Sequence, residues 1–253
     1  MRLAWGALGS SLSILVVGCG HDPGLNKAVR DAYFVPITPP QTALEPGLVA
    51  EVDPRVPEAP VIRASPTGAG VTPRIYTSQT PDASTKHEEK TDLSLGVTLP
   101  QDVQTRLSAK GAHTYSVVST GNEIRRVYID EYAQDIFPKL AEKYGGNWAG
   151  ALAQSKLYYF FELWCSKGLE YRFYDEHGID ITAKLDVKAM NLGAAAGYSM
   201  KDDGSLIFAS EKDTICIGYK ARPIRKKGTG EIGPEGGGTA TPWPPQATVA
   251  PYQ

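Results

Sequence analysis

The most constraining feature of the sequence is a series of strand-like segments between Leu157 and Ile224 that are joined by very short turns. Residues 157–165 are rich in aromatics, and residues 169–174 alternate apolar and polar side chains, which is the period of a half-buried strand. Parallel neighbours need a long crossover, so connections this short indicate antiparallel pairing. We therefore predict an α+β fold in which one or two helices pack on a meandering antiparallel sheet.

The same periodicity predicts the other elements of this domain. Further strands are expected at 93–99, 114–118, 123–128, 179–187, 205–210 and 214–224, with turns at 120–122, 167–168, 175–178 and 202–204. Tyr132, Ile136, Leu140 and Tyr144 are four residues apart, which predicts a helix over 130–144. Pro138 interrupts this pattern, so we expect either a kink or two short helices. A second helix is expected from Asn147 to Lys156. The alternative for residues 157–165 is that they continue this helix and do not form a strand. Residues 188–199 favour no single element.

Composition divides the rest of the chain. Residues 19–90 contain prolines throughout, which interrupt every candidate helix and predict an extended tether with a short edge strand at 47–52. The alternative for the first half of this segment is a strand that docks on the domain. The folded domain is expected at 91–225, and the Gly- and Pro-rich residues 226–253 are expected to form a disordered tail.

The N-terminus has the pattern of a secretory signal peptide at residues 1–18, with Arg2 before an apolar stretch from Leu3 to Val17. It ends in Val16-Val17-Gly18-Cys19, which resembles the lipobox of bacterial lipoproteins. The resemblance covers the signal peptide only, and the folded domain resembles no family that we recognise. The alternative is an ordinary signal peptide cut near Gly18.

The lipobox resemblance implies that Cys19 is diacylated on its thiol, becomes the mature N-terminus and is acylated again, with palmitate as a typical chain. Several acyl chains anchor a protein stably where one is marginal. Gly20 follows the cysteine in place of an aspartate, which in the enterobacterial sorting pattern favours the outer membrane. The expected location is therefore the cell envelope, with the membrane as a partner through the N-terminal lipid.

Composition also restricts the chemistry. The chain has 253 residues, a net charge of −2 and a pI near 6.1, which argues against nucleic acid as a partner. The four histidines have no paired-ligand spacing, so we expect no metal site, and no motif indicates a cofactor. With Cys19 acylated in an oxidising compartment, Cys165 and Cys216 are candidates for a disulfide, with two unpaired thiols as the alternative.

Three groups of side chains are candidates for function. An exposed aromatic face would bind sugars or a partner protein through Tyr158, Tyr159, Trp164 and Tyr174, and the alternative is that these rings fill the core. Asp175 and His177 would serve acid/base chemistry, or simply form a polar turn. Arg222, Arg225, Lys226 and Lys227 form a basic cluster that would meet anionic lipid or glycan, or be a solvated strand end.

The hypothesis that best fits these patterns is a non-enzymatic envelope lipoprotein that presents a binding or scaffolding domain to a protein or an envelope polymer. No nucleophile motif or catalytic constellation occurs in the sequence, so we expect no catalytic residues. One alternative is an accessory lipoprotein of a secretion or pilus-type envelope machine. Another is an envelope hydrolase with a site of dispersed Asp, Glu and His residues.

Overall fold

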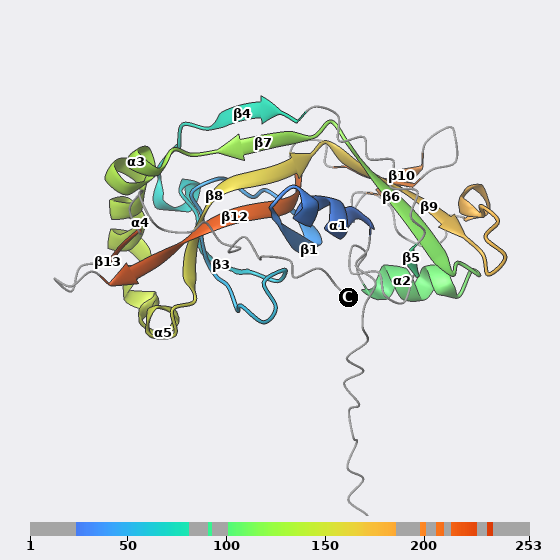
Figure 1. Ribbon diagram of the computed structural model, residues 1–253, viewed down its shortest axis with the longest axis horizontal. Helices are drawn as coiled ribbons and strands as arrows, with labels where there is room; N and C mark the ends of the chain where they lie inside the picture. Colours follow the sequence, from blue (N-terminus) through green and yellow to red (C-terminus); the bar gives the residue numbers. More distant parts are fainter. Residues whose placement is uncertain are drawn as a thin grey trace, which may run out of the picture.

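The computed structural model describes residues 24–80, 91–92, 101–185, 198–200, 206–209, 214–226 and 232–234. Its strands form an eight-stranded sheet and a five-stranded sheet, with helices at both ends and against one face (Figure 1). All described strand pairs are antiparallel. The predicted antiparallel α+β fold is confirmed.

The eight-stranded sheet is built around two long central strands. Its main order is β1 (Val35–Thr42), β12 (Ile215–Lys226), β8 (Leu157–Ser166), β2 (Val49–Glu51) and β3 (Val61–Ala64). β13 (Ile232–Pro234) pairs with β12, and β7 (Glu123–Arg126) pairs with both β8 and β4 (Tyr76–Gln79). The aromatic run in β8 thus lies between neighbours on both sides, as its apolar composition requires.

The five-stranded sheet continues the same ladder around a bend. Its order is β10 (Tyr198–Met200), β11 (Leu206–Ala209), β9 (Gly168–Tyr174), β6 (Thr114–Thr120) and β5 (Thr91–Asp92). The register of β6 with β9 runs on without a shift into that of β7 with β8. The predicted hairpin turns at 120–122 and 167–168 are therefore wrong, because each segment passes through the bend and keeps its partner.

Buried polar bonds hold this bend. The Ser166 hydroxyl donates to the carbonyl oxygen of Thr120 at 2.7 Å and accepts from the backbone N–H of Thr120 at 3.1 Å. Gly121 has a φ of +62°, a conformation that glycine adopts without strain. A sequence pattern that normally reverses a chain here bends a two-stranded ribbon.

The helices pack at the ends and on one face of the sheets. They are α1 (Gly24–Asp31), α2 (Gln101–Ser108), α3 (Ile129–Glu131), α4 (Phe137–Tyr144) and α5 (Ala149–Ala153), with a π-helical turn at Tyr132–Ile136 and single 3₁₀ turns at Thr67–Ala69, Gly145–Asn147 and Thr182–Lys184. The π turn ends at Ile136, two residues before Pro138, which lacks the N–H that a regular helix would use. The helical run continues through Pro138, so the expected division into two short helices is wrong, and the irregularity is the π turn before the proline. The second helix is shorter than expected, and Asn147 is not its cap.

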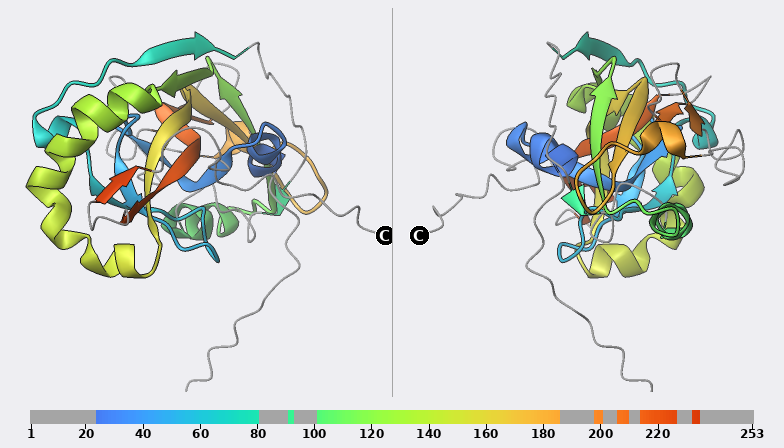
Figure 2. Two further views of the ribbon diagram at one scale, coloured as in Figure 1. Left: turned by 60° about the vertical axis from the view of Figure 1, so that its left-hand side comes forward. Right: turned by 90° about the vertical axis from the view of Figure 1, so that its right-hand side faces the viewer.

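The two faces of the eight-stranded sheet have different covers. On one face, which we call the helix face, Trp164 and Ile217 pack with α1 residues, and Tyr159 packs with the α3–α5 segment. Figure 2 shows α3, α4 and α5 curving around one end of the sheet, with α1 beside its middle. The other face carries Tyr158, Phe160 and Tyr219 and is covered by the chain around β1 and β2, so we call it the loop face.

The predicted tether is wrong for residues 24–80. This segment forms α1 and β1 to β4, and Leu48, Val49 and Ala50 are buried at 1% exposure or less. The alternative of a docked strand holds, and β2 is an interior strand of the sheet, not an edge. The expected 91–225 domain therefore lacks strands that belong to its core. Residues 19–23 and 81–90 lie outside the described part of the chain.

Other boundaries also differ from the sequence expectations. Over residues 179–185, the described part of the strand predicted at 179–187, the structure has one bridge between Tyr174 and Asp180, followed by a 3₁₀ turn. In the predicted disordered tail, residues 232–234 form β13. The strand at 93–99, the turn at 202–204 and the tail from 235 to 253 fall outside the described residues.

Candidate functional site

The predicted aromatic binding surface does not exist as a surface. Tyr158, Tyr159 and Trp164 are 8%, 0% and 4% exposed, and Tyr174 is half-buried. Tyr158 lies on the loop face and Tyr159 and Trp164 lie on the helix face, because the register of β8 shifts by one residue between Phe160 and Glu162 and so changes the alternation. The prediction is wrong because both faces of this strand are covered, and the alternative that these rings fill the core holds.

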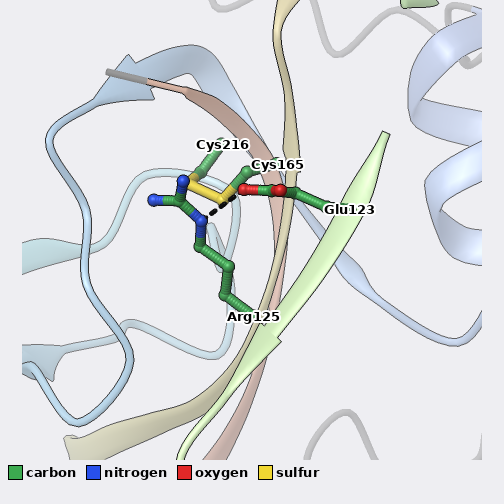
Figure 3. Close-up of a disulfide and its surroundings, with 4 residues drawn as sticks. All are labelled: Glu123, Arg125, Cys165 and Cys216. Carbon is green, nitrogen blue, oxygen red and sulfur yellow. Dashed lines mark hydrogen bonds and ion pairs between the residues drawn. A yellow bond between two sulfur atoms is a disulfide. The ribbon is translucent and has the colours of Figure 1, made fainter. Parts of the chain in front are cut away.

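Cys165 and Cys216 form the predicted disulfide, which joins β8 to β12 across a directly paired position. Both cysteines are fully buried on the loop face. On the neighbouring strand β7, Arg125 Nε donates to Glu123 Oε1 at 2.5 Å, and this ion pair lies beside the disulfide (Figure 3). Because both cysteines are buried, the disulfide is shielded from reagents in solution, and we expect it to contribute to the stability of the fold.

The Asp175–His177 pair forms a turn. Asp175 Oδ1 accepts the backbone N–H groups of His177 at 3.0 Å and Ile179 at 2.9 Å, and the bond from Ile179 is the main cause that lowers the pKa of this carboxyl. The His177 ring points to the neighbouring Glu176 at 3.5 Å, and both side chains are largely exposed. This geometry stabilises the connection after β9 and leaves Asp175 ionised at neutral pH.

A group of charged side chains lies on the helix face, which we call the basic strip: Arg126, Glu162, Lys220 and Arg222. In the register of the sheet, Glu162 is paired with Lys220 on one side and Arg126 on the other. Lys220 Nζ lies 3.0 Å from Glu162 Oε2, whereas Arg126 Nε is 4.0 Å from Glu162 Oε1. One carboxylate thus lies between two cations on the face that carries α1 and the α3–α5 segment.

Arg222 is the unusual member of the basic strip. It is paired in register with Tyr159, and its guanidinium Cζ lies 5.3 Å from the ring centroid of Phe161. Its Nε and Nη1 atoms are buried and have no hydrogen-bond partner in the described part of the chain. The residue as a whole is only partly buried, so the guanidinium lies at the boundary between the core and solvent.

Two stacked tyrosines lie next to Arg222. The rings of Tyr159 and Tyr132 are 4.0 Å apart and nearly parallel, and neither hydroxyl has a hydrogen-bond partner among the described residues. Burial raises the pKa of Tyr159 to about 12, with a lowering by the Arg222 charge and a raising by Asp130. Burial, with a smaller effect from Tyr159, also raises the pKa of Tyr132. Both hydroxyls are therefore protonated donors at neutral pH.

Sequence reasoning identified only part of this arrangement. The basic cluster predicted at the end of the last strand divides in the structure, because Arg225 and Lys226 are exposed while Arg222 faces the helix side of the sheet. Lys227 lies outside the described residues. Arg126 and Glu162 were missed, since only the strand order brings them to the same part of the sheet as β12. Tyr132 was missed because it reaches Tyr159 only through the packing of its helical segment on β8. The one available signal was the i, i+2 spacing of Lys220 and Arg222.

The described residues contain neither a candidate metal centre nor a candidate membrane-spanning helix. No group of three or more His, Cys, Asp or Glu side chains among them has an arrangement that would hold a metal ion. No helix in the described ranges has the length and apolar character needed to cross a membrane.

The comparisons with known proteins add little to this geometry. No protein-family model and no curated protein matches the sequence. Among solved structures, the chain is similar to a bacterial gasdermin from Bradyrhizobium tropiciagri, with 15% identity over 83% of this chain and 90% of that chain and a TM-score of 0.48. A likeness at this level carries no functional argument, so the function is argued from the residues of this chain.

Proposed function

We propose that the chain is a non-enzymatic lipoprotein of the bacterial cell envelope, in which acyl chains on Cys19 anchor a folded binding domain to a membrane, the outer membrane being the expected one. The observation that carries this proposal is the order Arg2, apolar stretch, Val16-Val17-Gly18-Cys19. The turn role of Asp175 supports a binding function over hydrolysis at that position, because its carboxylate is occupied by backbone N–H groups.

The position of α1 changes the form of this proposal. Since the described fold begins at Gly24, only four residues, 20–23, lie between it and the anchor cysteine. The five Cα–Cα steps from Cys19 to Gly24 span about 18 Å when fully extended. The domain would therefore be held close to the lipid surface, and not at the end of a long tether.

Membrane fractionation and intact mass of the wild-type chain and of Cys19→Ser test the anchor. We expect the wild type in the membrane fraction, with a mass increase of several acyl chains on a peptide that begins at Cys19. Cys19→Ser should lose both properties, and Ser10→Ala, which leaves residues 16–19 intact, should keep them. An unmodified, freely soluble wild-type protein would overturn the proposal.

A further inference from the structure

The buried nitrogens of Arg222 carry an inference about what the domain binds. Buried donors in native proteins nearly always have a partner, and a buried charged donor without one is costly. Arg222 has two such atoms, Nε and Nη1, and neither has a hydrogen-bond partner among the described residues. An arrangement of this kind is explained if the missing acceptor is supplied by a ligand.

The geometry of a guanidinium indicates the kind of acceptor. Its two edges suited to paired hydrogen bonds combine Nη2 with either Nε or Nη1, so each edge of Arg222 contains one of the unpartnered atoms. Such an edge matches two oxygens of a carboxylate or a phosphate. The Phe161 ring, whose centroid is 5.3 Å from Cζ, is an apolar neighbour that accepts no conventional hydrogen bond, so it does not occupy these edges.

Neighbouring donors favour phosphate over carboxylate. Tyr159, opposite Arg222 in the register, has a hydroxyl with no partner among the described residues, and Lys220 lies two residues along β12 on the same face. A carboxylate accepts hydrogen bonds in one plane, whereas a tetrahedral phosphate that binds the Arg222 edge also offers oxygens outside that plane to these further donors. Glu162 already pairs with Lys220, and Asp130 lies near enough to Tyr159 to affect its pKa. These carboxylates would repel a polyanion, so a single phosphate group fits best.

We propose that Arg222, Lys220 and the Tyr159 hydroxyl form a binding site for a phosphate group, carried by a lipid headgroup or by a soluble molecule. The inference rests on the proposed binding role of the domain but not on the acylation of Cys19. The position of the site is consistent with a lipid source. Lys220 Nζ lies 4.3 Å from the ring of Phe34, which follows α1 closely, and α1 begins five residues after Cys19.

Binding of inorganic phosphate to the full chain with Cys19→Ser tests the site without interference from acyl chains. We expect phosphate to raise the melting temperature in a saturable way, with acetate at equal ionic strength as the carboxylate comparison. Arg222→Gln and Arg222→Lys should lower the phosphate affinity at least tenfold, because the lysine keeps the charge but lacks the planar fork. Arg55→Gln, the same change at an exposed arginine on the β2–β3 connection, should bind as the parent does.

Vesicles distinguish the two sources of phosphate. Sedimentation of the same Cys19→Ser chains with phosphatidylglycerol vesicles, and with phosphatidylcholine vesicles as a second headgroup, shows whether a lipid phosphate reaches the site. Arg222-dependent binding of vesicles or of inorganic phosphate supports the proposal and identifies the source. Absence of both, binding that survives Arg222→Gln, or an equal response to acetate would overturn it.

Stability without ligand gives a second, independent readout. Arg222→Met removes the unpartnered nitrogens and keeps much of the apolar stem, so the variant should melt about 2–4 °C higher than its parent while it loses the phosphate response. A purely structural arginine would show the reverse, with a lower melting temperature and an unchanged response, and that outcome would also overturn the proposal.

Discussion

Gly121 and Lys167 lie opposite each other at the bend that joins the two sheets. They occupy the positions between the pairs Thr120–Gly168 and Glu123–Cys165, where the register continues unchanged. A Cβ atom on Gly121 would come within 2.9 Å of Lys167 Cδ and 3.2 Å of its Cβ. The close approach and the positive φ both require glycine at this point of the ribbon.

Replacement of Gly121 tests this requirement. Gly121→Ala should lower the free energy of unfolding by about 2 kcal/mol, through backbone strain and contact with Lys167. Urea denaturation followed by tryptophan fluorescence measures the change. Adding Lys167→Ala should recover part of the loss, because Cγ and Cδ are then absent.

Two glycines serve as controls for that measurement. Gly70 has a φ of +75° but open space around a Cβ, so Gly70→Ala should cost only about 1 kcal/mol. Gly146 has open space and no positive φ, and Gly146→Ala should be neutral or slightly stabilising. Equal losses at 121 and 70 would show that the Lys167 contact contributes nothing.

The disulfide should make a large contribution to stability. Cys165 and Cys216 are 51 residues apart in sequence, and closing a loop of that length stabilises by about 4 kcal/mol in the chain-entropy model. The double variant Cys165→Ala, Cys216→Ala should lose about 2–4 kcal/mol in urea denaturation. Because both residues are fully buried, the native wild type should resist reduction by dithiothreitol until it is unfolded. Rapid reduction of the folded protein would contradict this expectation.

Much of the sheet could be predicted because the pattern of apolar and polar residues within each strand indicates which of its side chains are buried. The run at 157–166 is strongly apolar, and the residues of β9 alternate, so both strands were found within a few residues. The apolar spacing of Tyr132, Ile136 and Leu140 likewise identified the helix that packs on β8, since all three are buried.

The N-terminal strands could not be predicted, because the proline content of this segment indicated an extended tether and not a part of the sheet. β1 contains Pro36, Pro39 and Pro40, yet it is a terminal strand of the sheet order and, among the described strands, pairs with β12 alone. Its register shifts between Pro36 and Gln41, so the missing N–H groups are tolerated. The basic strip was beyond prediction for a different reason, because its residues come from three strands that meet only in the folded sheet.

Truncation of the chain tests whether the N-terminal strands belong to the core. A chain of residues 91–225 lacks α1, β1 and β2, and with them the buried side chains of Val29, Val35 and Val49. We expect it to show no cooperative thermal unfolding and no near-UV circular dichroism, whereas residues 24–234 should show both. A cooperative transition for 91–225 would mean that the N-terminal strands dock on a domain that is stable without them.

Stability should fall at alkaline pH because of Tyr159. Burial raises its pKa in the folded state to about 12, above the ordinary value of 10.0, so folding favours the protonated phenol. The resulting stabilisation is fully present below pH 10 and is lost as the pH rises from 10 towards 12. Between about pH 8.5 and 11.5 the free energy of unfolding from urea titrations should decrease by about 1–2 kcal/mol on account of this residue.

Phenylalanine variants show which tyrosines cause the decrease in stability at alkaline pH. Tyr159→Phe should reduce the slope of unfolding free energy against pH, without abolishing it, because burial also raises the pKa of Tyr132 and of Tyr219. Tyr33→Phe, at a side chain that is 66% exposed, should leave the slope unchanged. If Tyr159→Phe and Tyr33→Phe have the same pH dependence as the wild type, the pKa of the Tyr159 hydroxyl is the same in the folded protein as in the unfolded chain, and its burial beside Arg222 and Tyr132 does not contribute to the alkaline loss of stability.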